Sequence, residues 1–365
     1  MYAMENKQIF EFSKDKTDGD SSLNNLLGGK GANLAEMSKM GIPVPPGFTI
    51  TTEVCNYFTE NKELPVNLNQ DIKKAVSKLE TFSDKSFSGK GTPLLLSVRS
   101  GGRISMPGMM DSILNIGLND NNVSHLAETF NDERFALDSY RRLIQMYSNV
   151  VLGVEHDRFE AVLANKKRLD NVASDADFNV EQLKWIINAY KNTVERFTNA
   201  EFPQDPYEQL MGSIEAVFNS WQNKRAATYR KINNIPDEWG TGATVQTMVF
   251  GNLNDKSGTG VAFTRNPSNG LKELYGEYLI NAQGEDVVAG IRTPHPIRED
   301  KNIEQESLES KFPKVYRDIL EISTKLENHF KEVQDIEFTI ENENIYLLQT
   351  QKSKKNCSSE CKSCN

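Results

Sequence analysis

The stretch 335–341 near the end of the chain alternates polar and apolar residues, and a second strand-like stretch follows at 345–351. A repeat of two residues is typical of a strand with one buried face and one polar face. The residues between them, 342–344, are Asn, Glu and Asn, which favour a tight turn. The sequence therefore predicts an antiparallel hairpin, and such a hairpin needs a sheet with at least one covered face.

The polar face of this hairpin carries candidate site residues. Side chains at positions i and i+2 of a strand share a face, so Asp335 and Glu337 are expected to point the same way. By the same rule Gln349 and Gln351 share a face of the return strand. Two neighbouring carboxylates suit Mg²⁺, whose remaining ligands usually come from phosphates and water. The alternative is the solvated outer face of a sheet.

The order of the predicted elements indicates the fold class. Residues 123 to 230 have the pattern of charged amphipathic helices. After residue 244 the pattern is that of strands, with one helix at 313–330. Helices followed by strands predict an α+β fold. The expected division is a first lobe at 1–118 to which 205–243 returns, a helical subdomain at 119–204, a second lobe at 244–353 and a disordered tail at 354–365.

Charge and hydropathy exclude several classes of protein. The net charge is −9, which argues against broad nucleic-acid binding, because that needs a basic surface. It also disfavours docking to anionic membranes. The first residues lack the apolar core of a signal peptide, and no apolar run approaches the ~20 residues of a membrane helix. We therefore expect a soluble, cytoplasmic protein.

Three of the four cysteines, Cys357, Cys361 and Cys364, lie within the last nine residues. Thiolates at this spacing could bind zinc or an iron–sulfur cluster, but a reduced, disordered tail is the favoured interpretation. The histidines are expected to serve packing or the surface rather than catalysis.

A glycine-rich turn precedes a predicted helix at 28–31, where the sequence is Gly-Gly-Lys-Gly. Glycines there allow backbone N–H groups to approach an anion, and Lys30 adds a positive charge. The pattern is not that of a P-loop, and a simple helix cap is the alternative. Arg99 is predicted to lie at the end of a buried strand that breaks at Gly101-Gly102, where it could bind phosphate or form a surface ion pair.

Three acids, Glu277, Glu285 and Asp286, lie in a stretch that is otherwise small or apolar and is predicted to be strand–turn–strand. Acids in such a place can bind a metal or a ribose. Turn chemistry, which also favours Gly and Asp, is the alternative.

These motifs together, and in this order, resemble one family. They are Gly-Gly-Lys-Gly-Ala-Asn-Leu-Ala-Glu-Met at 28–37, Ser-Val-Arg-Ser-Gly at 97–101, Ser-Met-Pro-Gly-Met-Met-Asp at 105–111, Gly-Thr-Gly-Val-Ala-Phe-Thr-Arg at 258–265, Gly-Glu-Tyr-Leu-Ile-Asn-Ala-Gln-Gly-Glu-Asp at 276–286 and Asp-Ile-Glu-Phe-Thr-Ile at 335–340. The combination resembles the nucleotide-binding domain of the pyruvate, phosphate dikinase family over about residues 20–353. The resemblance implies an ATP-grasp fold, in which two lobes sandwich the nucleotide, with a helical insert.

The resemblance also implies roles for individual residues. The implied ligands are ATP, Mg²⁺ and inorganic phosphate. The implied assignments are catalytic and phosphate-binding roles for Lys30, Arg99 and Gln349, nucleotide contacts for Glu277, Glu285 and Asp286, and metal binding for Asp335 and Glu337.

The chain departs from the family pattern in two places. The last strand reads Gln-Thr-Gln at 349–351, whereas the family has Gln-Thr-Arg with a phosphate-binding arginine. The family's Thr-Ser-His-Ala-Ala motif, which bears the phosphorylated histidine, is absent. The first hypothesis is a kinase that phosphorylates a histidine on a separately encoded, pyruvate-binding partner. The alternatives are a nucleotide-binding module without turnover and an incomplete dikinase fragment.

Overall fold

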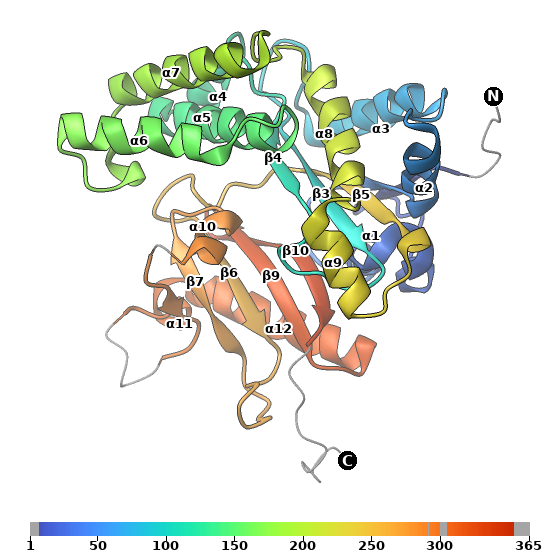
Figure 1. Ribbon diagram of the computed structural model, residues 1–365. Helices are drawn as coiled ribbons and strands as arrows, with labels where there is room; N and C mark the ends of the chain where they lie inside the picture. Colours follow the sequence, from blue (N-terminus) through green and yellow to red (C-terminus); the bar gives the residue numbers. More distant parts are fainter. Residues whose placement is uncertain (1–6, 291, 300–304, 354–365) are drawn as a thin grey trace. The chain divides into compact units, whose positions relative to one another are not determined.

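The computed structural model describes residues 7–290, 292–299 and 305–353, and it shows an α+β fold as predicted. Two five-stranded sheets carry the helices (Figure 1). The chain divides into two compact units. Of the described residues, the first comprises 7–11, 22–31 and 46–248, and the second comprises 12–21, 32–45 and those from 249 to 353.

The sheet of the first unit has the order β1-β2-β5-β3-β4. Its strands are β1 (Ile9–Phe12), β2 (Gly47–Ile50), β3 (Leu96–Gly102), β4 (Ser112–Ile116) and β5 (Thr241–Thr247). The sequence-based division assigned residues from 244 onward to the second lobe, but β5 pairs with β2 and β3 in the first sheet. Every residue of β5 is buried, which suits a strand with neighbours on both sides.

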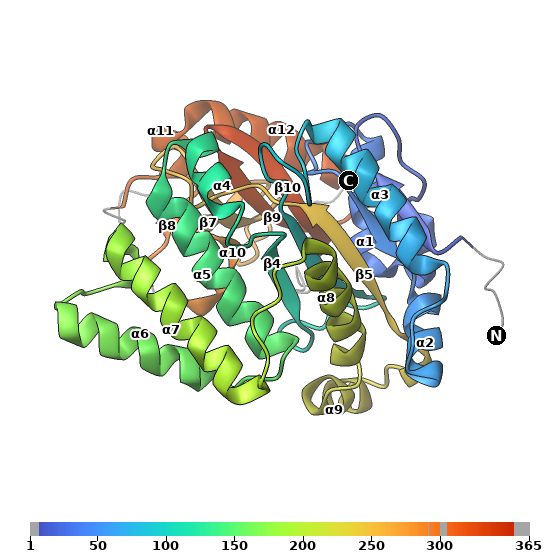
Figure 2. The same cartoon turned by 90° about the horizontal axis from the view of Figure 1, so that it is seen from above.

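Most of the helices belong to the first unit. They are α2 (Thr52–Asn61), α3 (Leu68–Ser83), α4 (Val123–Phe130), α5 (Glu133–Val150), α6 (His156–Asp170), α7 (Val180–Thr198), α8 (Pro206–Ser220) and α9 (Lys224–Ile232). Helices α5 and α7 lie side by side, with α4 and α6 next to them (Figure 2). Polar residues fix where these helices begin: Asp132 accepts from the N–H of Phe135, and Asp205 precedes the proline that opens α8.

The sheet of the second unit has the order β10-β9-β6-β7-β8. Its elements are β6 (Gly258–Phe263), β7 (Tyr275–Ile280), α10 (Gly284–Ala289), β8 (His295–Pro296), α11 (Leu308–Lys311), α12 (Pro313–Phe330), β9 (Gln334–Glu341) and β10 (Asn344–Lys352). The predicted hairpin is confirmed as β9 and β10, and the predicted helix at 313–330 as α12.

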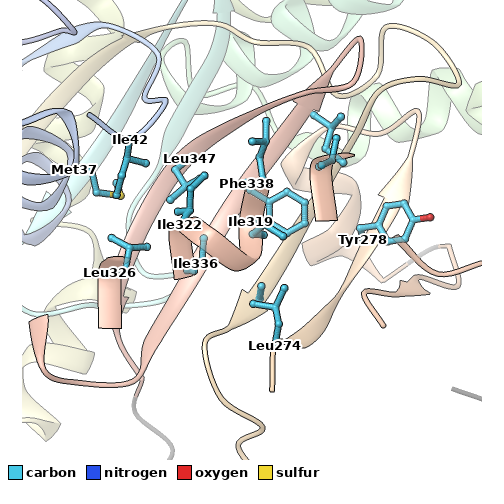
Figure 3. Close-up of a cluster of buried hydrophobic side chains, with 14 of the residues drawn as sticks. Met37, Ile42, Leu274, Tyr278, Ile319, Ile322, Leu326, Ile336, Phe338 and Leu347 are labelled. Atoms are coloured by element: carbon cyan, nitrogen blue, oxygen red, sulfur yellow. The ribbon is translucent and has the colours of Figure 1, made fainter. Parts of the chain in front are cut away.

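One face of this sheet packs on α12. Ile336 and Phe338 of β9 meet Ile319 and Leu326 of α12, and all four side chains are fully buried (Figure 3). Each such burial contributes ~1.5–3 kcal/mol of transfer free energy. Because alternate residues of β9 are committed to this core, the residues between them must lie on the other face.

Helix α1 (Asn24–Lys39) is interrupted at Gly28, whose φ of 68° and ψ of 163° are not helical. The predicted glycine turn before a helix is thereby confirmed, and Lys30 lies in the first turn after the interruption. A Cβ on Gly28 would lie 1.7 Å from the carbonyl oxygen of Gly101. Only glycine fits this position, on grounds of both backbone conformation and space.

Among the residues described, no helix combines the length and the apolar character needed to cross a bilayer. Cys55 is buried in α2 as a free thiol. The cysteines of the predicted tail, residues 354–365, lie outside the described residues.

The substitution Gly28→Ala should destabilise the first unit by more than the unfavourable backbone conformation alone would. The φ of 68° and ψ of 163° at Gly28 lie in a region that is essentially open to glycine alone, which costs another residue ~1–3 kcal/mol, and the contact with Gly101 raises the expected loss to ~3 kcal/mol or more. The matched control is Gly153→Ala, because Gly153 has a φ of 72° but open space around it. Urea unfolding followed by tryptophan fluorescence measures both, and equal losses for the two variants would contradict the steric argument.

Candidate functional site

A row of polar side chains crosses the second sheet on the face opposite the core. In the strand register Glu337 lies opposite Gln349 of β10 and Val261 of β6, and Val261 lies opposite Glu277 of β7. Residues opposite one another in antiparallel strands share a face, and neighbouring strands are ~4.8 Å apart. The backbone therefore aligns two carboxylates and one carboxamide, with Glu277 two strands from Glu337.

The next row on this face contains Asp335 and Gln351, which lie opposite one another. Gln351 Nε2 donates a hydrogen bond to Asp335 Oδ2 at 3.0 Å. Burial raises the pKa of Asp335; the hydrogen bond from Gln351 lowers it in part, and the negative charge of Glu337 raises it further. As the alternation predicts, Asp335 and Glu337 share one face, and a bound cation would relieve the repulsion between them.

Gln349 completes this group. Its side-chain oxygen Oε1 is buried and has no hydrogen-bond partner. Two carboxylates and one amide oxygen are the hard ligands that Mg²⁺ takes, and Mg²⁺ usually completes its octahedron with phosphate and water. The described residues hold no group of three or more His, Cys, Asp or Glu side chains able to bind a metal.

The region of Glu285 and Asp286 differs from the prediction. The predicted strand–turn–strand is confirmed for residues 258–280 as β6 and β7, but Glu285 and Asp286 lie beyond it, in the short helix α10, which was not predicted. Asp286 Oδ2 accepts a hydrogen bond from the backbone N–H of Gln283 at 2.8 Å, which caps the first turn. Asp286 thus has a structural contact, whereas Glu285 is exposed. Their nucleotide-binding roles stay predictions.

The first unit carries the two predicted cationic site residues. Arg99 is not at a strand end as predicted, since β3 continues through Gly101 and Gly102. The continuation exists because Gly102 still pairs with Thr241 of β5, a partner that local sequence does not reveal. A Cβ on Gly101 would lie 3.1 Å from Lys30 Cβ. Since positions 99 and 101 share a face, Lys30 and Arg99 lie on one side of the first sheet.

The methionine-rich loop at 105–111 follows β3. Met106 is buried, whereas Pro107 and Gly108 are exposed. Asp111 forms an ion pair with Arg225 of α9, so the loop is attached to a helix at its end. Its tip is exposed and Met106 is interior.

The sequence interpretation missed Gln283, which is 4% exposed although its side chain is polar. Neither Gln283 Oε1 nor Nε2 has a hydrogen-bond partner. The signal that could have identified it is its context, a long amide between an alanine and a glycine three residues after β7.

Comparison with known proteins finds one family. The family model described as "Pyruvate phosphate dikinase, AMP/ATP-binding domain" matches residues 24–88 and 59–320. A pyruvate, phosphate dikinase of Rickettsia conorii is 50% identical over 351 residues, which are 96% of this chain and 39% of the relative. That of Rhizobium meliloti is 48% identical over 98% of this chain and 40% of the relative, and the chloroplastic enzyme 1 of Arabidopsis thaliana is 47% identical over 96% and 35%. The chain thus spans about two fifths of the length of these relatives.

The substitution Asp335→Asn should stabilise the protein at neutral pH. Because the folded-state pKa of Asp335 is raised, its charged form costs stability above that pKa, and the cost vanishes as the pH falls below the ordinary aspartate value of ~4. We expect a gain at pH 7, limited by solvent screening because the side chain is only half-buried, that disappears near pH 3.5, measured by urea unfolding. In addition, Mg²⁺ with a nucleotide should stabilise the wild type more than the variant. A variant that is less stable than the wild type at pH 7 would contradict the assigned repulsion.

Proposed function

The chain belongs to the pyruvate phosphate dikinase AMP/ATP-binding domain family, and from this membership we propose that it binds Mg·ATP and transfers a phosphoryl group to a histidine of a partner domain. The proposal takes the fold to be of the ATP-grasp type. Two antiparallel sheets, one in each unit, support this assignment.

The observation that carries the proposal is the polar face of the second sheet. Asp335 and Glu337 are aligned beside the unpartnered oxygen of Gln349. These residues would hold Mg²⁺, which supplies charge neutralisation for the phosphates when it is bound. The chain's own part is to fix the carboxylates in place, since β9 is hydrogen-bonded on both sides.

The proposal assigns the phosphates of ATP to Lys30 and Arg99. Lys30 lies in the first turn of a helical segment whose backbone N–H groups favour an anion. Arg99 is held in the middle of a five-stranded sheet, so its backbone is rigid and its guanidinium can bind phosphate oxygens in a fixed geometry. Phosphoryl transfer depends mainly on such positioning and on charge neutralisation.

The second candidate function is nucleotide binding without turnover. Gln351, which stands where the family resemblance implies an arginine, is neutral and donates its hydrogen bond to Asp335. It cannot neutralise charge that develops on a transferred phosphate. Loss of one such preorganised group typically costs a factor of ~10²–10³ in rate.

The variant Gln351→Arg decides between the two functions. If the chain is a slow kinase, the variant should raise the rate of label transfer from radiolabelled ATP to a histidine-bearing dikinase domain by ~10²-fold or more. The matched control is Gln351→Met, which has a similar size and no charge and should not raise the rate.

Equilibrium binding of ATP should be measured on the same proteins. Binding without label transfer in both the wild type and Gln351→Arg would contradict the kinase and leave the binding module. No nucleotide binding by either protein would contradict both functions.

A further inference from the structure

Strand β10 carries a β-bulge between Leu347 and Gln349. Leu347 lies opposite Phe338 of β9. Gln349, two residues later, lies opposite Glu337, which is only one residue from Phe338. In a regular strand Gln349 would lie opposite Ile336 and would face the core. The bulge therefore turns Gln349 to the face of the carboxylates, and bulges commonly redirect a side chain in this way.

Two hydrogen bonds hold the outer edge of β10, one on each side of the bulge. The N–H of Leu347 donates to the carbonyl oxygen of Pro43 at 2.8 Å. The carbonyl oxygen of Thr350 accepts from Asn33 Nδ2, also at 2.8 Å. Because β10 is the last strand of its sheet, these two backbone groups point away from β9. In a regular strand the residues that point to one edge are an even number of positions apart, but Leu347 and Thr350 are three apart. The two bonds therefore fit the bulged strand and do not fit a regular one.

The segment that supplies both bonds is fixed by the core of the second unit. Met37 and Ile42 are buried in the same cluster as Leu347 (Figure 3). The N–H of Ile42 donates to the carbonyl oxygen of Met37 at 3.1 Å, at the end of α1. Asn33 lies within α1, next to the fully buried Leu34. An amide on a packed helix is held more precisely than one on a loop, so it can fix the position of a strand.

Two contacts inside the hairpin depend on the same register. Gln351 Nε2 reaches Asp335 on the polar face, and the hydroxyl of Thr350 donates to Gln334 Oε1 at 2.9 Å on the buried face. Thr350 is thus held by its side chain from β9 and by its carbonyl oxygen from α1. Removal of the Asn33 amide leaves the contacts inside the hairpin, so β10 should stay paired and lose only the precision of its register.

We propose that Asn33 is a positioning residue of the candidate metal site, because it holds the bulged form of β10 that keeps the oxygen of Gln349 beside Glu337. The inference rests on the proposed function, in which Gln349 binds Mg²⁺ together with Glu337 and Asp335. Asn33 acts through the backbone of Thr350, which lies between the two glutamines of β10. Groups that orient metal ligands without binding the metal typically change metal affinity by ~10–100-fold.

The contribution of the metal to nucleotide affinity tests the proposal. Dissociation constants of ATP are measured for the full chain, with excess Mg²⁺ and with EDTA, by displacement of a fluorescent nucleotide. The ratio of the two constants is the factor by which the metal strengthens binding. Asn33→Ala should lower this ratio by ~10-fold or more and should leave the affinity in EDTA unchanged. A general loss of folded protein would weaken both affinities together, so the ratio separates positioning from stability.

The matched control is Asn344→Ala. Asn344 lies at the start of β10, and its Nδ2 donates to the carbonyl oxygen of Asn342 at 3.1 Å in the hairpin turn. This variant also removes an amide–carbonyl bond from the hairpin, but it should keep the ratio. Asn33→Asp, which has the same size and loses the donor, is a second variant in which the ratio should fall. Hydrogen exchange of the amides of 347–352, measured without nucleotide, should be faster in Asn33→Ala and unchanged in Asn344→Ala.

The outcomes separate this inference from the proposed function. If Mg²⁺ strengthens ATP binding by the wild type, and Asn33→Ala and Asn33→Asp keep the ratio, the inference is overturned and Mg·ATP binding stands. Equal weakening with Mg²⁺ and with EDTA, or unchanged hydrogen exchange of β10, would also overturn it. If the wild type does not bind ATP, or binds it no better with Mg²⁺, the proposed function fails and the inference fails with it.

Discussion

The register of β9 between β10 and β6 is the constraint on which the second unit depends. Ile336 and Phe338 enter the core against α12, and the residues that alternate with them, Asp335 and Glu337, are thereby directed to the opposite face. A slip of one residue would bury both carboxylates and expose the core side chains. The hydrophobic effect that stabilises the core therefore also fixes the candidate site, and neither can change without the other.

A comparable coupling holds in the first unit, where the glycine at the interruption of α1 contacts β3. Gly28 approaches Gly101 so closely that no side chain fits between them. This approach determines where the helical segment with Lys30 begins relative to the strand with Arg99. Backbone contact, rather than a side-chain interaction, thus brings the two cationic residues to one face of the sheet.

The sequence was sufficient to predict the secondary structure where that structure follows from local periodicity. The hairpin of β9 and β10 and the helix α12 were predicted with nearly correct bounds, because alternation and helical spacing are visible within a few residues. The errors occurred where the secondary structure depends on contacts that the local sequence pattern does not reveal. Pairing with β5 extends β3 through Gly101 and Gly102, and the short helix α10, which begins with a capping contact between Gln283 and Asp286, was not predicted. The buried amide of Gln283 was invisible for the same reason, since burial is a property of the folded chain.

The polar face of the second sheet carries two neighbouring acids, one in each of the two rows described above. Asp335 and Glu337 are both acidic, and Gln351 offers Asp335 a dipole rather than a charge. An arginine at position 351 would compensate one carboxylate and attract phosphate, whereas glutamine leaves the face more negative by one charge. Such a face favours a cation over a free anion. Under the proposed function, a phosphate ligand should therefore bind there together with a divalent metal rather than as the free anion.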